Sequence, residues 1–162
     1  DVKVSEVHGM AQRGGSVVSQ VRYGKKIYSP IIKKGDADII LAFEKLEAAR
    51  WLDYLKPDGM VIINNDRVDP LPVMTGKVEY PEDITDKISQ LVQKTFVVNA
   101  TDLAVACGNV KTANIVLLGL LSSAVELPEA EVAQAIEKLV PEKAIAVNLK
   151  AFQEGLKLYT QL

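Results

Sequence analysis

ADIILAFEKLEAARWLDYLKPDGMVII, residues 37–63, predicts a strand, a helix and a second strand in direct succession. The run Ala37–Phe43 is short, apolar and rich in branched side chains, which is typical of a strand buried on both faces. From Glu44 onward the apolar residues fall on one face of a helix, and the KPDG stretch at 56–59 is expected to end it. Met60–Ile63 then predicts another buried strand. This order indicates an α/β domain with a largely parallel sheet.

Shorter strands are predicted on either side of this unit. The alternating Val2–Val7 and the β-branched Ser16–Tyr23 predict two strands that form an early hairpin. Ile27–Ile32 predicts a short further strand, although Pro30 interrupts it, and Phe96–Asn99 predicts a last one.

Helices are predicted for the rest, including the whole C-terminal third. The first is expected to have Pro81 near its start and Ile84, Ile88, Leu91 and Val92 on its apolar face. The later helices are expected at Thr101–Cys107, Lys111–Val125, Pro128–Leu139 (with Val132, Ile136 and Leu139 on one face) and from Pro141 onward. That last helix carries an apolar stripe, expected to dock on the sheet, of Ile145, Leu149, Phe152, Leu156 and Tyr159.

Composition excludes several classes of function. With 162 residues, 48% of them hydrophobic and 25% charged, the chain predicts one globular domain. The net charge is −2 with both signs mixed along the sequence, so no nucleic-acid partner is expected. The apolar run Ile115–Leu121 is far shorter than the roughly 20 residues that span a bilayer, and no leader pattern opens the chain, so a cytoplasmic protein without a membrane contact is expected. One cysteine and one histidine cannot supply the ligands of an iron–sulfur cluster or a structural zinc.

The segment HGMAQRGG, residues 8–15, is the first candidate site. It connects the two hairpin strands, and its glycines allow positive φ and close approach of the backbone. Arg13 could bind a carboxylate or phosphate through two parallel hydrogen bonds, with histidine and glutamine as neighbouring donors or acceptors. The alternative is a surface connection with no ligand. The candidate cofactor-binding or subunit-interface residues are His8, Gly9, Gln12, Arg13, Gly14 and Gly15.

The segment GNVKTAN, Gly108–Asn114, is the second candidate. Lys111 and Asn114 are expected one turn apart near a helix N-terminus, which together with Asn109 makes a plausible anion site. The alternative is purely structural: Gly108 ends one helix and Asn109 caps the next. No residue of the chain is assigned a catalytic role.

Two weaker features are given structural interpretations. Cys107 is best explained as a small buried hydrophobic residue. The alternative is a nucleophile that folding pairs with the only histidine, which lies most of the chain away in sequence. The stretch PDGMVIINND, residues 57–66, is best explained as a turn and a strand that account for Asn64 and Asn65, because D-G is a turn dipeptide.

Three stretches resemble a known family. They are SEVHGMAQRGGSVVSQVRYG at 5–24, GDADIILAFEKLEAAR at 35–50 and GNVKTANIVLLGLLS at 108–122. They are similar to the beta subunits of indolepyruvate:ferredoxin oxidoreductases, which belong to the gamma-subunit group of 2-oxoacid:ferredoxin oxidoreductases, pyruvate enzymes included.

The resemblance implies a Rossmann-like, three-layer α/β domain with a helical C-terminal third. It implies a non-autonomous subunit of an enzyme that oxidatively decarboxylates a 2-oxoacid, here expected to be indolepyruvate or another aryl pyruvate, to an acyl-CoA and passes electrons to ferredoxin. Thiamine diphosphate and the iron–sulfur clusters would lie in a large partner subunit. This chain would close the active site and help to bind coenzyme A or the partner.

One departure from the family pattern leads to an expectation about the domain. Family members ordinarily begin with a strand, a glycine-rich turn of the type G-x-G-G-Q-G and a helix, which precede the segment that opens this sequence. Residues 1–162 are therefore expected to form a single gamma-type domain without those elements. The alternative hypothesis is a free-standing nucleotide-binding or scaffold module with no role in catalysis.

Overall fold

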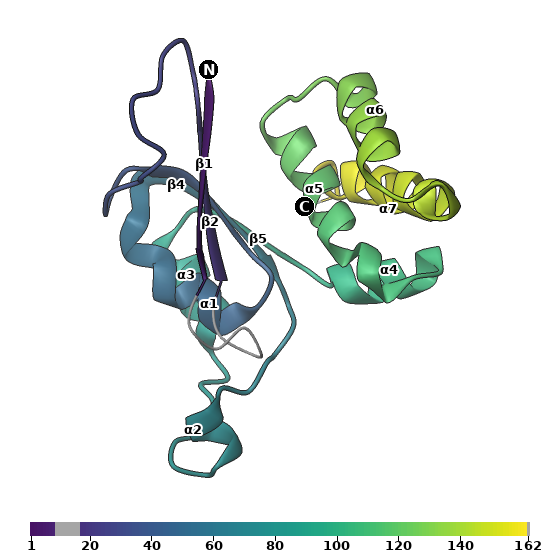
Figure 1. The fold of residues 1–162 in the computed structure, drawn as a ribbon. Helices are drawn as coiled ribbons and strands as arrows, with labels where there is room; N and C mark the ends of the chain where they lie inside the picture. Colours follow the sequence, from purple (N-terminus) through teal and green to yellow (C-terminus); the bar gives the residue numbers. More distant parts are fainter. Residues whose placement is uncertain (9–16, 162) are drawn as a thin grey trace.

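A parallel three-stranded sheet and a separate antiparallel hairpin organise the computed structural model, which describes residues 1–8 and 17–161 (Figure 1). The sheet has the order β3-β4-β5, and β1 pairs with β2. The strands are β1 Val2–His8, β2 Val17–Tyr23, β3 Ala37–Ala42, β4 Leu55–Asn64 and β5 Lys94–Val98. The predicted α/β class, the parallel sheet and the early hairpin are confirmed.

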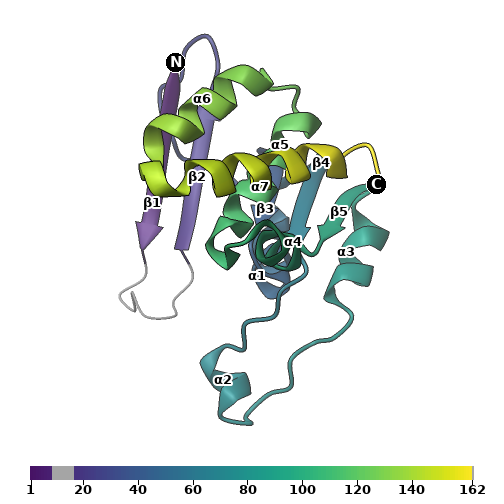
Figure 2. The ribbon, with the colours of Figure 1, turned by 90° about the vertical axis from the view of Figure 1, so that its right-hand side faces the viewer.

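Helices cover both faces of the sheet, which gives three layers (Figures 1 and 2). Helices α1 and α3 share a core with one face, and α4, α5 and α7 share a core with the other. The helices are α1 Lys45–Trp51, α2 Leu71–Met74, α3 Ile84–Leu91, α4 Ala100–Cys107, α5 Ala113–Ala124, α6 Glu129–Leu139 and α7 Ile145–Leu158, with the short 3₁₀ helices η1 Leu52–Tyr54, η2 Val110–Thr112 and η3 Glu142–Ala144.

The second half of strand β4, Met60–Ile63, is apolar without alternation because it is covered on both faces. Successive side chains of a strand point to opposite faces, so Val61 and Ile63 pack with the α1 and α3 core while Ile62 packs with the opposite core. All three are fully buried. A central strand covered on both sides therefore has no polar face, as the sequence predicts.

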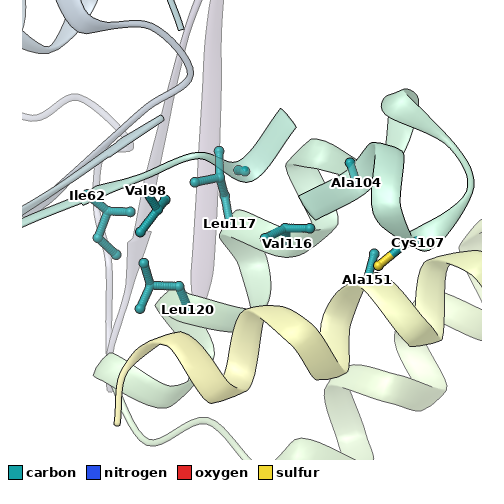
Figure 3. Close-up of a cluster of buried hydrophobic side chains, with 9 residues drawn as sticks. Ile62, Val98, Ala104, Cys107, Val116, Leu117, Leu120 and Ala151 are labelled. Atoms are coloured by element: carbon teal, nitrogen blue, oxygen red, sulfur yellow. The ribbon is translucent and has the colours of Figure 1, made fainter. Parts of the chain in front are cut away.

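Helices α5 and α7 cross at a pair of glycines. A Cβ atom at Gly155 would lie 2.1 Å from the carbonyl oxygen of Val116, and one at Gly119 would lie 2.4 Å from that of Phe152. Leu117 of α5 lies in one core with Ile62 and Val98 of the sheet (Figure 3). The C-terminal stripe therefore docks chiefly on α5. At its end it also reaches the sheet, as predicted, because the Tyr159 ring lies 5.7 Å from that of Phe96 in β5.

Two local predictions are wrong for physical reasons. Residues 27–32 form no strand, because side chains bind their backbone amides: the N–H of Ile32 donates to Gln20 Oε1 at 2.7 Å. The KPDG stretch lies inside β4 and does not end α1, which stops at Trp51 and continues as η1. Lys56 forms an ion pair of 2.5 Å with Asp38 of β3, and a shift in strand register accommodates the extra residues.

Three expected helix positions also differ. Helix α3 begins at Ile84, after Asp83, so Pro81 lies outside it. Leu91 is 75% exposed where α3 ends, and Leu139 is 83% exposed at the last residue of α6. In both helices the apolar face is buried at its centre, at Ile88 and Ile136, whereas its final residue is exposed.

Candidate functional site

The first predicted group of site residues belongs to the β1–β2 hairpin. Antiparallel pairing places His8 opposite Val17, so the ends of the connecting segment lie side by side. Gly9, Gln12, Arg13, Gly14 and Gly15 lie outside the described residues, and His8 is described by its backbone alone. Their binding role stays a prediction.

The second predicted group lies between α4 and α5. Gly108 has φ +115° and ends α4, while Asn109 Oδ1 accepts the N–H of Lys111 at 3.0 Å and caps η2. Both features match the structural alternative, because glycine tolerates the left-handed conformation and asparagine favours caps. Lys111 lies in η2 and not in the following helix, whereas Asn114 is in the first turn of α5, and both side chains are exposed.

The structure keeps this group apart from the hairpin. Figure 1 shows α4 on one side of the molecule and the β1–β2 hairpin on the other. The second group therefore lies in the helical layer, and the structure does not bring it together with the hairpin into one site. Its residues are Asn109, Lys111 and Asn114. An anion-binding role for them stays a prediction.

A buried amide that sequence interpretation missed joins the carboxyl ends of the strands. Asn64 ends β4 and is only 2% exposed. Its Oδ1 accepts the N–H of Ala100 at 2.9 Å, at the start of α4. Its Nδ2 donates to the carbonyl of Phe43 at 3.3 Å and to Thr101 Oγ1 at 3.1 Å. One side chain thus holds together the segments that follow β3, β4 and β5.

More polar groups surround this amide. Thr101 Oγ1 donates to Asp66 Oδ2 at 2.5 Å, and Asn65 Nδ2 donates to Asn99 Oδ1 at 3.0 Å. Ligands of parallel α/β sheets bind outside the carboxyl ends of the strands, so this is the edge at which a ligand is expected. The sequence signal was present, since polar residues directly follow two buried strands, but a turn was taken to explain Asn64 and Asn65.

A buried carboxylate completes the edge. Glu44 follows β3, is 6% exposed, and accepts the N–H of Glu47 at 3.0 Å, which caps α1. The Tyr80 hydroxyl also donates to this carboxylate in a short hydrogen bond. Burial first, and then the adjacent Glu44, raise the pKa of Tyr80 above its ordinary value. The Arg67 guanidinium lies 4.4 Å from the centre of the Tyr80 ring, which joins the two ends of the segment 65–80, and the Tyr80–Glu44 bond attaches that segment to the residues that follow β3.

These groups can position a ligand but do not form a metal centre. In residues 1–8 and 17–161, no cluster of three or more His, Cys, Asp or Glu side chains could hold a metal ion. Cys107 is a buried member of the α4–α5 core, as Figure 3 shows, which confirms its structural interpretation. Within the same described part of the chain, no helix is long and apolar enough to cross a membrane.

Comparison with known proteins adds a family, a relative and two solved structures. Residues 1–158 match the family described as pyruvate ferredoxin/flavodoxin oxidoreductase. The chain is 40% identical to the indolepyruvate oxidoreductase subunit IorB of Thermococcus kodakarensis, over 96% of this chain and 80% of that protein.

Two solved structures share the fold. The gamma subunit of a keto/oxoacid ferredoxin oxidoreductase from Geobacter sulfurreducens aligns with a TM-score of 0.66 and 24% identity, over 99% of this chain and 81% of that one. A 2-oxoglutarate:ferredoxin oxidoreductase from Magnetococcus marinus, with coenzyme A bound, aligns with a TM-score of 0.69 and 21% identity, over 99% of this chain and 26% of that one.

Proposed function

Because this chain belongs to the pyruvate ferredoxin/flavodoxin oxidoreductase family, as a subunit of a 2-oxoacid:ferredoxin oxidoreductase, we propose that it helps to form a coenzyme A site shared with a larger partner subunit. The site comprises the segment 8–16 and the carboxyl edge of the sheet. The substrate we propose is indolepyruvate or a related aryl pyruvate, from the 40% identity to an indolepyruvate oxidoreductase subunit. We place the complex in the cytoplasm.

The chemistry of the donor groups supports assigning thiamine diphosphate and the iron–sulfur clusters to the partner. A cluster is usually held by four thiolates, and the single cysteine of this chain, Cys107, is buried among apolar side chains. The partner's thiamine would supply the group that attacks the 2-oxoacid. This chain would bind and orient the acyl acceptor and exclude water.

The residues available fit the charge of coenzyme A. Its phosphate groups need cations or backbone amides, and Arg13 with Gly14 and Gly15 supplies a cation beside a backbone that a ligand can approach closely. At the sheet edge, the exposed Asn65 and the half-buried Thr101 add neutral hydrogen-bonding groups. Asn64 and Glu44 are buried and act as supports for that edge.

The free edge of β3 supports a further proposal about the domain. Among the described strands β3 pairs with β4 alone, and the hairpin pairs with neither. An open edge presents unpaired backbone groups. We propose that one more strand pairs along β3 in the assembled enzyme. Slower hydrogen exchange of β3 amides in the complex than in this chain alone would support the added strand, and equal exchange would contradict it.

A pair of arginine variants tests the coenzyme A proposal. In the reconstituted complex, Arg13→Ala should raise the KM for coenzyme A by about 10- to 100-fold, because a hydrogen-bonded charge contributes about 1.5–3 kcal/mol. Arg13→Lys should recover part of the loss. Arg50→Ala is the matched control, since Arg50 lies on α1 and pairs with Glu47 at 3.1 Å. An Arg13→Ala complex with an unchanged KM would refute the proposal, and a failure to assemble would assign the segment to the subunit interface.

A further inference from the structure

The segment between β2 and β3 forms a surface cavity that the shared site does not use. Its volume is about 350 Å³, at the lower end of the range for small-molecule pockets. The lining residues that matter are Arg22, Lys26, Tyr28, Ser29, Ile31 and Lys33. The cavity precedes β3, so it lies at the amino end of that strand. In Figures 1 and 2 this segment lies at the opposite end of the molecule from α2, which follows the carboxyl end of β4.

The lining carries positive charge in a protein whose net charge is −2. Three of its side chains are cations and none is acidic. Arg22 is anchored, because its Nη1 donates to the carbonyl of Ile31 at 3.2 Å and its Nη2 lies 3.8 Å from Asp36. Lys26 and Lys33 are exposed. Asp36 therefore offsets part of the charge of Arg22, whereas a bound anion would offset the charges of Lys26 and Lys33.

The backbone of this segment is held in place without a strand ladder. The N–H of Ile32 donates to Gln20 Oε1 at 2.7 Å, and the N–H of Ile27 donates to Asp1 Oδ2 at 2.9 Å. These bonds join the segment to β2 and to Asp1, the residue before β1. The backbone that carries the charged side chains is therefore already ordered before a ligand binds. Less conformational entropy of the protein is then lost on binding.

We propose that this cavity binds the phosphate group of a small phosphomonoester. The Arg22 guanidinium and the Lys26 and Lys33 ammonium groups would contact the phosphate oxygens. Tyr28, whose ring lies 5.0 Å from Lys26 Nζ, and Ile31 offer apolar surface to the organic part. The ligand that fits this cavity carries a compact dianion attached to a partly apolar group.

Titration calorimetry of the chain at low salt with inorganic phosphate, AMP and adenosine tests the proposal. We expect saturable binding of phosphate, tighter binding of AMP and weak binding of adenosine. The double variant Lys26→Ser with Lys33→Ser should weaken AMP binding by at least about tenfold, since it removes two charged donors. Both lysines are exposed, so the fold should persist, which circular dichroism checks.

The matched control is Lys138→Ser with Lys143→Ser, which makes the same charge change outside the cavity. It should keep wild-type affinity. Equal weakening in the control would reduce the effect to overall charge and overturn the proposal. Absence of saturable binding to the wild-type chain, or adenosine binding as tightly as AMP, would overturn it as well.

Discussion

Replacing Gly155 by alanine tests the packing that joins the C-terminal helix to the domain. In an exposed helix this change stabilises by about 1 kcal/mol, because alanine is the better helix former. Here the added Cβ would lie 2.1 Å from the carbonyl oxygen of Val116 and 2.9 Å from the Cα of Gly119. Both neighbours are backbone atoms of α5, so no side chain can rotate away.

The size of the effect follows from that geometry. Ordinary contact begins at 3.4 Å, so the oxygen and the new Cβ need about 1.3 Å more separation. Moving α7 away from α5 by such a distance loosens the contacts of the fully buried Phe152 and Leu117. Overpacking of a core costs about 1–3 kcal/mol, and the lost contacts add to it. We expect Gly155→Ala to lower the free energy of unfolding by about 3 kcal/mol.

Urea denaturation of the chain measures this change. With a slope of about 2 kcal/mol/M, the midpoint should fall by about 1.5 M. Gly24→Ala is the control, because a Cβ there would make ordinary contact with Ile27 at 3.4 Å, and its midpoint should hardly move. A Gly155→Ala protein as stable as the wild type, or more stable, would refute the close crossing of α5 and α7.

Two further variants test the carboxyl edge of the sheet. Asn64→Ala should lower the free energy of unfolding by about 2–4 kcal/mol, because it leaves the N–H of Ala100 without its partner and removes two more bonds, and chemical denaturation measures it. Tyr80→Phe should cost about 1–2 kcal/mol near pH 7. Because the folded pKa of Tyr80 is raised above the ordinary 10.0, the unfolded chain loses this proton first, and the stability that Tyr80 contributes is lost as pH rises above about 10. Tyr80→Phe should therefore show a smaller fall in stability between pH 9 and 11, and an identical fall would contradict the buried hydroxyl.

The sequence predicts the core strands well because a continuous apolar run indicates a strand that is buried on both faces. Ile39–Ala42 and Met60–Ile63 are apolar on both faces, and only a covered strand is stable with that pattern. The ends of elements are less predictable. KPDG favours a turn locally, yet pairing with β3 draws it into β4. Helical periodicity places Leu139 on the apolar face of α6, but it cannot show that the side chain at this position is exposed.

In the candidate site too, features set by neighbouring residues could be predicted, and features set by residues distant in sequence could not. Capping by Gly108 and Asn109 is local chemistry and could be predicted from adjacent residues. For the Asn64 network, the sequence shows that polar residues follow the buried strand, but it does not identify the partners of Asn64, since Ala100 and Thr101 lie 36 and 37 residues away in sequence. The exposure of the hairpin could not be predicted either. Five valines of β1 and β2 are 53–63% exposed, namely Val2, Val4, Val7, Val17 and Val21. Alternation in a strand does not say whether a second layer covers it.

Reconstitution with the large subunit tests the central claim most directly. The rate of indolepyruvate-dependent, coenzyme A-dependent dye reduction is measured for the large subunit alone, for this chain alone and for the two together. A non-autonomous subunit that completes the site predicts no activity from this chain alone and a large gain when both are present. An equal rate from the large subunit with and without this chain would contradict the account.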